Sequence, residues 1–253
     1  MGEVQFWDVA TGTLRLSVPV TYDTLYGASF SPDGKLLAVG CGDNTVRAFE
    51  VETGKQVLYQ GASNDWVLDA VFSVDGVHLV TVGRDRTMKL IEVKTERFID
   101  NITSITPGAL KGGLSAVDRH PTKDELLCGG ADGSPKTYLM HRTMKRKIGD
   151  DYQLIRQYEA MPGRVFAVEY SPDGNFFVAG SSYNNDGEVR VYKVDDGKLV
   201  WKHAAGPIYA ATYSPDGKTV AAAGFGGKVW LLDAATGTPV KDFLPVPLEE
   251  GKE

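Results

Sequence analysis

Short apolar runs recur along the whole chain, separated by Gly, Pro, Asp and Asn. Within each of five copies one run precedes a turn and a second run follows it, as "LYGASF" and "LLAVGC" do at 25–41. A third run and a weaker fourth run complete each copy. The runs are rich in Val, Leu, Tyr and Phe, which predicts β-strands. Many are apolar at consecutive rather than alternate positions, and this pattern indicates strands that are covered on both faces.

The turn between the first and second runs marks the repeat. Ser-Pro-Asp-Gly stands at 31–34, 171–174 and 214–217, Ser-Val-Asp-Gly at 73–76, and the degenerate His-Pro-Thr-Lys at 120–123. Pro at the second position presets φ for a turn, and Gly at the fourth accepts a positive φ. Successive copies start 42, 47, 51 and 43 residues apart. A period of about 40–45 residues, with four strands in each copy, is typical of a β-propeller.

These features resemble the WD40 family over residues 2–243, and the best marks are the turns, the period and Phe-Trp-Asp at 6–8. The resemblance implies an all-β fold, a β-propeller of four-stranded antiparallel blades. Five blades are complete, and the opening segment aligns with the third and fourth strands of a sixth. We therefore expect a propeller domain at 1–243, incomplete at its N-terminus, and a Pro-containing acidic tail or linker at 244–253.

The sequence departs from the family in its polar positions. Trp-Asp is kept only at 7–8, and the Gly-His dipeptide usual before the first strand is absent. The family's buried network of His, Ser/Thr, Asp and Trp therefore cannot form in full. Four copies keep the family's turn aspartate between the second and third strands: Asp43, Asp85, Asp132 and Asp186.

Three explanations fit the half blade at the N-terminus. Preceding strands are lost, or the half blade closes a strained six-membered ring, or another chain fills the gap. We favour the first explanation because Met1 directly precedes a predicted strand. An open gap exposes apolar blade faces, so self-association through this gap is a further expectation.

Composition and charge exclude several classes of partner. The net charge of −6 argues against nucleic acid, because phosphate binding relies on a surplus of Lys and Arg. No apolar run approaches the roughly 18 residues that span a membrane, so no membrane partner is expected. Without a recognisable signal peptide the localisation is unknown, with the cytoplasm as the default. Cys41 and Cys128 lie in apolar runs a whole blade apart, which predicts buried free thiols rather than a disulfide.

Candidate catalytic chemistry is sparse. The four histidines fall in different copies without ligand-like spacing, so no metal site is predicted. The sequence has neither Gly-x-Ser-x-Gly nor a phosphate-binding Gly-Lys-Ser/Thr. The predicted first strands line the channel, and their matching positions hold one acid among small residues: Gly27, Asp69, Ala116, Ala167 and Ala210. That set is not a catalytic ring, so we expect neither an enzyme nor a cofactor.

The resemblance implies a peptide-binding face, formed by the loops from fourth to first strand and from second to third strand. Aromatic residues and Arg, which are enriched in binding hot spots, gather in and beside these loops. They are Tyr22, Tyr26, Trp66, Arg84, Arg86, Arg164, Phe166, Tyr183 and Tyr209. The predicted partner-binding residues are the four that stand in turns: Trp66, Arg84, Arg164 and Tyr183.

A second candidate surface is the insertion at 140–153 of the third full copy. It carries four cations on an otherwise acidic protein: Arg142, Lys145, Arg146 and Lys147. The local field predicts a docking site for an acidic partner, and a solvated loop is the alternative.

The sequence thus predicts a non-catalytic scaffold that binds a protein or peptide partner. The alternative is an accessory or regulatory propeller of a larger bacterial redox or hydrolytic protein. The stretch at 145–174 resembles WD40 regions of large bacterial proteins that also carry c-type cytochrome segments. Such a parent, if secreted, places the domain outside the cytoplasm. This chain itself has no Cys-x-x-Cys-His for haem attachment.

Overall fold

The computed structural model describes residues 2–104, 111–145, 147 and 149–246. Over these ranges the chain forms twenty-two β-strands, arranged as five four-stranded sheets and one two-stranded sheet. The two-stranded sheet, here called the N-terminal hairpin, pairs β1 (Gly2–Asp8) with β2 (Thr13–Thr21). The last strand, β22, ends at Phe243. Residues 247–253 of the expected tail at 244–253 lie outside the described residues.

The four-stranded sheets follow one another along the chain, and each is antiparallel with its strands in sequence order. Sheet 1 contains β3 (Leu25–Phe30), β4 (Leu36–Cys41), β5 (Val46–Glu50) and β6 (Gln56–Gln60). Sheet 2 contains β7 (Val67–Phe72), β8 (His78–Gly83), β9 (Met88–Glu92) and β10 (Arg97–Asn101). Sheet 3 contains β11 (Leu114–Arg119), β12 (Glu125–Gly130), β13 (Lys136–Leu139) and β14 (Leu154–Gln157). Sheet 4 contains β15 (Arg164–Tyr170), β16 (Phe176–Ser182), β17 (Glu188–Lys193) and β18 (Leu199–Ala204). Sheet 5 contains β19 (Ile208–Tyr213), β20 (Thr219–Gly224), β21 (Val229–Asp233) and β22 (Pro239–Phe243).

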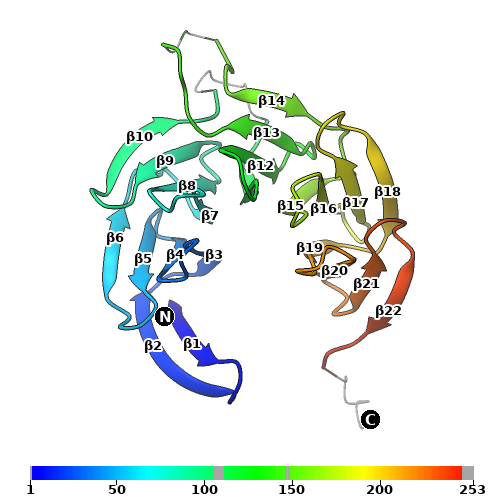
Figure 1. The fold of residues 1–253 in the computed structure, drawn as a ribbon, viewed down its shortest axis with the longest axis horizontal. Helices are drawn as coiled ribbons and strands as arrows, with labels where there is room; N and C mark the ends of the chain where they lie inside the picture. The colour runs from blue at the N-terminus through cyan, green and yellow to red at the C-terminus, as the bar shows by residue number, and fades with distance from the viewer. Residues whose placement is uncertain (1, 105–110, 146, 148, 247–253) are drawn as a thin grey trace.

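The sheets stand radially around a common centre, with the first strand of each sheet innermost and the fourth outermost (Figure 1). This arrangement is the one expected for propeller blades. The ring is open: the N-terminal hairpin and sheet 5 form its two ends and are separated in Figure 1.

Consecutive apolar residues in one strand serve two different cores. Leu37 and Val39 of β4 pack in a cluster with Phe6 of the N-terminal hairpin, whereas Ala38 between them packs in a cluster with Leu79 of sheet 2. Successive side chains of a strand point to opposite faces. The apolar runs of the sequence therefore correspond to strands covered on both faces, as predicted.

The Ser-Pro-Asp-Gly turns close the first hairpin of a sheet by local hydrogen bonds. In sheet 1 the Ser31 hydroxyl donates to Asp33 Oδ1 at 2.7 Å, and Ser31 Oγ accepts from the Leu36 N–H at 2.9 Å. Gly34 adopts a φ of +70°, which explains the glycine at this position. The turn chemistry is as predicted.

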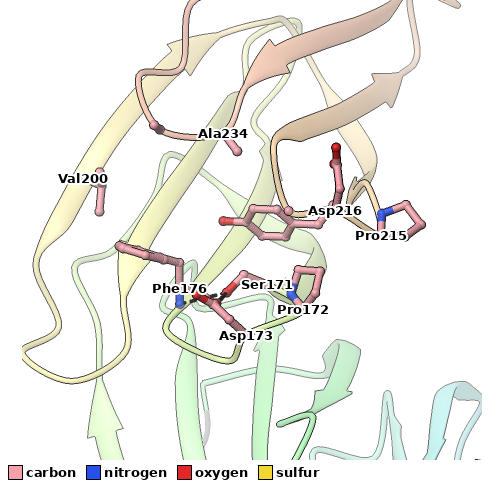
Figure 2. Close-up of a pocket in the computed structure, with 11 residues that line it drawn as sticks. Ser171, Pro172, Asp173, Phe176, Val200, Pro215, Asp216 and Ala234 are labelled. Atoms are coloured by element: carbon pink, nitrogen blue, oxygen red, sulfur yellow. Dashed lines mark hydrogen bonds between the residues drawn. The ribbon is translucent and has the colours of Figure 1, made fainter.

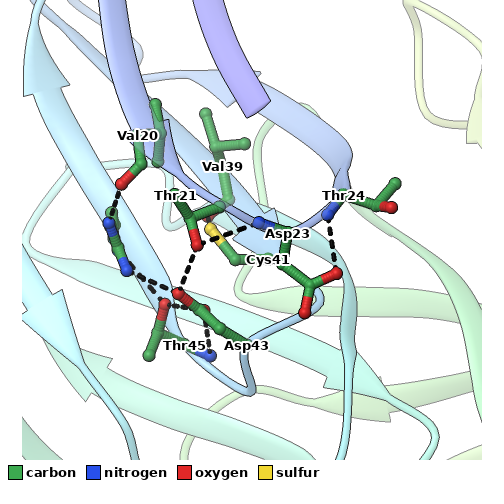
Figure 3. A network of polar contacts seen from close by, with 9 residues as sticks. Val20, Thr21, Asp23, Thr24, Val39, Cys41, Asp43 and Thr45 are labelled. Atoms are coloured by element: carbon green, nitrogen blue, oxygen red, sulfur yellow. Dashed lines mark hydrogen bonds and ion pairs between the residues drawn. The ribbon is translucent and has the colours of Figure 1, made fainter. Parts of the chain in front are cut away.

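The polar network inside the blades differs from the family pattern. Asp43 accepts hydrogen bonds from the hydroxyls of Thr21 and Thr45 and pairs with Arg47 (Figure 3). The same spacing recurs in sheet 2, where Asp85 accepts from the Thr87 hydroxyl and pairs with Lys89. In sheet 3 Asp132 accepts from the backbone N–H of Ser134 and pairs with Lys136. Sheets 1, 2 and 3 thus each pair the turn aspartate with a cation four residues further along the chain.

Asp186 does not take this role in sheet 4. It is exposed at the tip of the turn, where its backbone pairs with Tyr183. Glu188 instead accepts from Arg190 Nε at 2.6 Å. The longer turn in this copy, which includes Asn184 at a φ of +53°, displaces the aspartate from the buried position.

Candidate interaction face and channel mouth

Trp66 and Arg84 come together as a stacked cluster. Trp66 ends the loop before β7, and Arg84 follows β8; the Arg84 N–H donates to the Trp66 carbonyl at 3.1 Å. The Arg84 guanidinium lies 4.3 Å from the centroid of the Trp66 ring, and the Tyr26 ring stacks on Trp66 at 5.7 Å. Arg84 Nε also lies 3.6 Å from Asp65 Oδ2, with half of the Arg84 side chain exposed. The cluster is a partly exposed, already ordered surface of aromatic and cationic groups.

Arg164 and Tyr183 lie near each other at the ends of adjacent strands of sheet 4. Arg164 is exposed at the start of β15 and pairs with Ser182, the residue before Tyr183. The Tyr183 side chain is 58% exposed. The structure thus brings Trp66 and Arg84 into contact, and it places Arg164 and Tyr183 at neighbouring strand ends of sheet 4, beyond sheet 3.

An aromatic-lined cavity lies at the inner strands, and Tyr26, which stacks on Trp66, is part of its lining. Its volume is about 410 Å³, and every four-stranded sheet contributes to its lining. The residues that matter below are Tyr26, Asp69, Phe166 and Tyr209. The Phe166 and Tyr209 rings meet edge to face at 5.0 Å. We call this cavity the channel mouth.

A second cavity of about 210 Å³ shares Asp69 with the channel mouth and also contains Asp118 and Glu169. Asp69 Oδ2 accepts from the Val117 N–H at 3.0 Å, in the next sheet along the ring. Asp118 and Glu169 accept in the same way from the N–H groups of Tyr170 and Tyr213, at 2.7 Å and 2.9 Å. The three carboxyl groups therefore link sheets 2 to 3, 3 to 4 and 4 to 5.

Asp118 and Glu169, which do not stand at the matching positions compared in the sequence, also line this part of the channel. They were missed because the sequence comparison used one position of the first strand, and both acids stand two positions further on. The signal was present in the runs "LSAVDR" and "VFAVEY", each of which carries an acid at its fifth position.

Burial dominates the protonation of these groups. It raises the pKa of Asp69 to about 7 and that of Asp118 to about 6, although backbone N–H groups bonded to each carboxylate oppose the shift. Burial also raises the pKa of Glu169. Burial therefore raises the pKa of all three channel acids above the ordinary value of a carboxyl group.

The insertion at 140–153 is organised around Arg142. Arg142 Nη2 lies 2.7 Å from Asp150 Oδ1, and its side chain is only 9% exposed. This hydrogen bond from Arg142 lowers the pKa of Asp150. Lys145 and Lys147 are exposed, whereas Arg146 lies outside the described residues. Arg142 therefore holds the loop, and the cations offered to a partner by the described part of the loop are Lys145 and Lys147.

A groove lies between the turns of the neighbouring sheets 4 and 5. It has a volume of about 340 Å³, and Phe176, Val200 and Ala234 line it (Figure 2). Its rim carboxylates are committed to turn geometry, because Asp173 accepts from the Ser171 hydroxyl and Asp216 from that of Ser214. The groove is an apolar seam between two neighbouring turns.

Other chemistry is limited in the part of the chain that the structure describes. No group of three or more His, Cys, Asp or Glu side chains there is placed to hold a metal ion. Cys41 and Cys128 are free and buried, and burial raises the pKa of the Cys128 thiol to about 12. None of the described residues forms a helix of the length and hydrophobicity needed to cross a bilayer.

The radial four-stranded sheets, with their recurring turns and loop face, define a propeller-type repeat protein. Residues 54–92 and 152–193 match the family model described as "WD domain, G-beta repeat". Residues 5–68 match the model described as "Anaphase-promoting complex subunit 4 WD40 domain". These matches support the WD40-repeat family for this chain, a family whose members generally mediate protein–protein interactions.

Similar proteins point to the same kind of repeat. The chain is 26% identical over 148 residues to the human "U3 small nucleolar RNA-associated protein 4 homolog", covering 54% of this chain and 20% of that protein. The mouse protein of the same name is 28% identical over 151 residues, covering 55% of this chain and 20% of its own length. Mouse "Coronin-7" is 43% identical over 47 residues, 19% of this chain and 5% of that protein. The chain thus spans a fifth or less of these relatives, and the comparisons give no support to the expected bacterial, cytochrome-linked setting.

Proposed function

We propose that this chain is a non-catalytic interaction module that binds a protein or peptide across the face carrying Trp66, Arg84, Arg164 and Tyr183. The observation that carries the proposal is the partly exposed stack of Arg84, Trp66 and Tyr26, whose tyrosine also lines the channel mouth. Tyr, Trp and Arg are the residues most enriched in binding hot spots. Arg84 and Tyr26 already hold the Trp66 side chain in place, so binding a partner there costs little side-chain entropy of Trp66.

The test compares partner capture by two matched variants. One carries alanine at Trp66, Arg84, Arg164 and Tyr183. The control carries alanine at Tyr59 and Phe98, which are 49% and 38% exposed on the outermost strands β6 and β10. A partner identified by affinity capture and mass spectrometry is titrated against each by calorimetry. We expect the first variant to bind at least about 100-fold more weakly and the control to bind as the wild type does. Equal affinity of all three proteins, with unchanged circular dichroism, would refute the proposal.

The docking of an acidic partner at the insertion is a separate part of the proposal. It rests on the exposed Lys145 and Lys147. Replacing both by Glu should weaken binding of such a partner and reduce its dependence on salt. Arg142 is left unchanged, because its removal breaks the pair with Asp150 that holds the loop. Salt-dependent binding that survives both substitutions contradicts this part.

We further propose that the N-terminal hairpin is the outer half of a sixth blade. Trp7 is the penultimate residue of β1, and its side chain is 55% exposed. The penultimate residue of the third strand is almost fully buried in all five sheets: Phe49, Ile91, Tyr138, Tyr192 and Leu232. On the inner strand β3, Phe30 is likewise 57% exposed where Phe72 of β7 is 1% exposed. Both exposed rings lie where an inner hairpin pairing with β1 is expected to pack.

Grafting a matching hairpin tests this arrangement. Residues 164–187, which carry the inner strands of sheet 4, are joined to Glu3 so that they precede β1 as they precede β17. We expect the melting temperature to rise by about 4 °C or more and acrylamide quenching of Trp7 fluorescence to fall. The control joins the same residues in scrambled order. If both fusions melt and quench alike, the N-terminal hairpin is not an unfinished blade.

A further inference from the structure

The channel mouth combines two kinds of group that recognise a cation. Tyr26, Phe166 and Tyr209 place three aromatic rings around the cavity of about 410 Å³, and Asp69 places a carboxyl group in its lining. Aromatic faces attract ammonium and guanidinium groups, and more strongly when water is excluded. A cavity of this size is within the range that accommodates a side chain or a small ligand.

The titratable side chains in the linings of the channel mouth and of the second cavity are all acidic. Asp69 also lines the second cavity, together with Asp118 and Glu169. No Lys, Arg or His stands among the described lining residues of either cavity. Arg119 follows Asp118 in the chain, but its Nη1 is directed to the carbonyls of His120 and Pro121 at 3.5 Å and 3.4 Å. The two cavities thus share Asp69, and their described linings combine three acids with three aromatic rings.

Asp69 retains capacity to accept a further donor. Its Oδ1 accepts from the Ala70 N–H at 2.9 Å and its Oδ2 from the Val117 N–H at 3.0 Å. An ionised carboxylate has about four acceptor positions, so one remains on each oxygen. A guanidinium or ammonium group entering from the mouth supplies both the donor and the positive charge that the buried carboxylate lacks.

We propose that the partner of the proposed interaction face inserts one cationic side chain, of Arg or Lys, between Tyr26, Phe166 and Tyr209 toward Asp69. The inference rests on the proposed function, because a partner must reach this face first. It adds the chemistry of the central contact. The occupant is a peptide segment of a protein, because Tyr26 of the mouth stacks on Trp66 of the proposed peptide-binding face.

The probe is a pair of short peptides that differ in one charge. Acetyl-Gly-Arg-Gly-amide is compared with acetyl-Gly-citrulline-Gly-amide, in which a neutral urea replaces the guanidinium at the same shape. Binding to the full chain is followed by ¹H–¹⁵N NMR titration. We expect the arginine peptide to bind at least 10-fold more tightly and to shift the resonances of residues at the channel mouth. Equal affinity of the two peptides overturns the inference.

Three variants separate the channel mouth from general charge attraction. Asp69→Asn removes the carboxylate charge of the channel. Tyr209→Ser removes an aromatic ring of the mouth. Because that ring is 46% exposed, the Tyr209→Ser protein is expected to fold. Asp195→Asn removes the same charge from a side chain that is 89% exposed on a turn elsewhere. We expect the preference for arginine over citrulline to fall at least 5-fold in the first two variants and to persist in the third. Should Asp69→Asn unfold, the result for Tyr209→Ser decides. A preference retained in Tyr209→Ser, or lost equally in Asp195→Asn, overturns the inference.

Failure here is distinguishable from failure of the proposed function. If the identified partner needs Trp66, Arg84, Arg164 and Tyr183 but the two peptides bind alike, the interaction face stands and the cationic contact is rejected. If the arginine peptide is selected but the partner ignores those four residues, the channel mouth stands and the proposed face is rejected.

Discussion

The buried ion pair of sheet 2 offers a sharp prediction about stability. The side chains of Asp85 and Lys89 are 5% and 6% exposed and form an ion pair. Asp85 also accepts from the Thr87 hydroxyl at 2.7 Å, the Thr87 N–H at 3.1 Å and the Asn64 N–H at 3.1 Å. Asp85→Ala removes the only carboxylate paired with Lys89 among the described salt bridges and strands its ammonium in the protein.

The expected loss in the free energy of unfolding is about 3–5 kcal/mol, the range for breaking a buried pair from one side. That is a large fraction of the roughly 5–15 kcal/mol that holds a typical domain together. The exposed pair between Arg84 and Asp65 provides the matched control, since its side chains are 50% and 38% exposed. Asp65→Ala should therefore lose less than about 1 kcal/mol.

Urea unfolding followed by tryptophan fluorescence measures both losses. The double variant Asp85→Ala, Lys89→Met should recover part of the first loss, because it removes the stranded charge as well as its partner. The reasoning is refuted if Asp85→Ala loses no more than Asp65→Ala, or if the double variant is less stable than Asp85→Ala alone. Either result means that the ion pair and hydrogen bonds of Asp85 do not offset the desolvation of Asp85 and Lys89.

Two further predictions concern a turn glycine and the channel acid. Gly174 and Gly34 occupy equivalent turns at φ values of +73° and +70°, but a Cβ on Gly174 meets the His120 ring whereas one on Gly34 meets open space. Alanine at either position should lose about 1–2 kcal/mol from backbone strain, and Gly174→Ala about 1–3 kcal/mol more from the clash; equal melting temperatures contradict the clash. The raised pKa of Asp69, about 7 against an ordinary 3.8, means that the folded state holds its proton more tightly, so its contribution to stability is greatest below about pH 4 and is lost as the pH rises through about 7. The stability of the wild type relative to Asp69→Asn should therefore fall from pH 5 to pH 8 in urea titrations, and a constant difference contradicts the assignment.

The strands were largely predictable because their signals are local. The runs "LYGASF", "VLDAVF" and "IYAATY" coincide with β3, β7 and β19. Each run is followed by a turn whose Ser, Asp and Gly make hydrogen bonds within five residues, so a short stretch of sequence contains all the groups that define it. Consecutive apolar positions likewise predict that a strand is covered on both faces, but they do not identify the elements that cover it.

The residues of the proposed interaction face could be chosen from the sequence, but their contacts could not. Position in a turn identified Trp66 and Arg84 separately. Their stacking, and the ring of Tyr26 on the same indole, join residues of sheets 1 and 2. The ion pairs between the turn aspartates of sheets 1, 2 and 3 and a cation four residues later became evident only from the fold.

The sequence by itself determined the repeat, the turns and the strands, because propensity, periodicity and hydrogen bonds between near neighbours act over a few residues. Only the tertiary structure decided what the channel contains. Asp69 stands two positions away from Asp118 and Glu169 in their respective repeats, so matching positions placed Ala116 and Ala167 beside it instead. The three acids nevertheless line one cavity, because each bonds to the inner strand of the next sheet around the ring. That convergence depends on the radial packing of whole sheets, which no local pattern encodes.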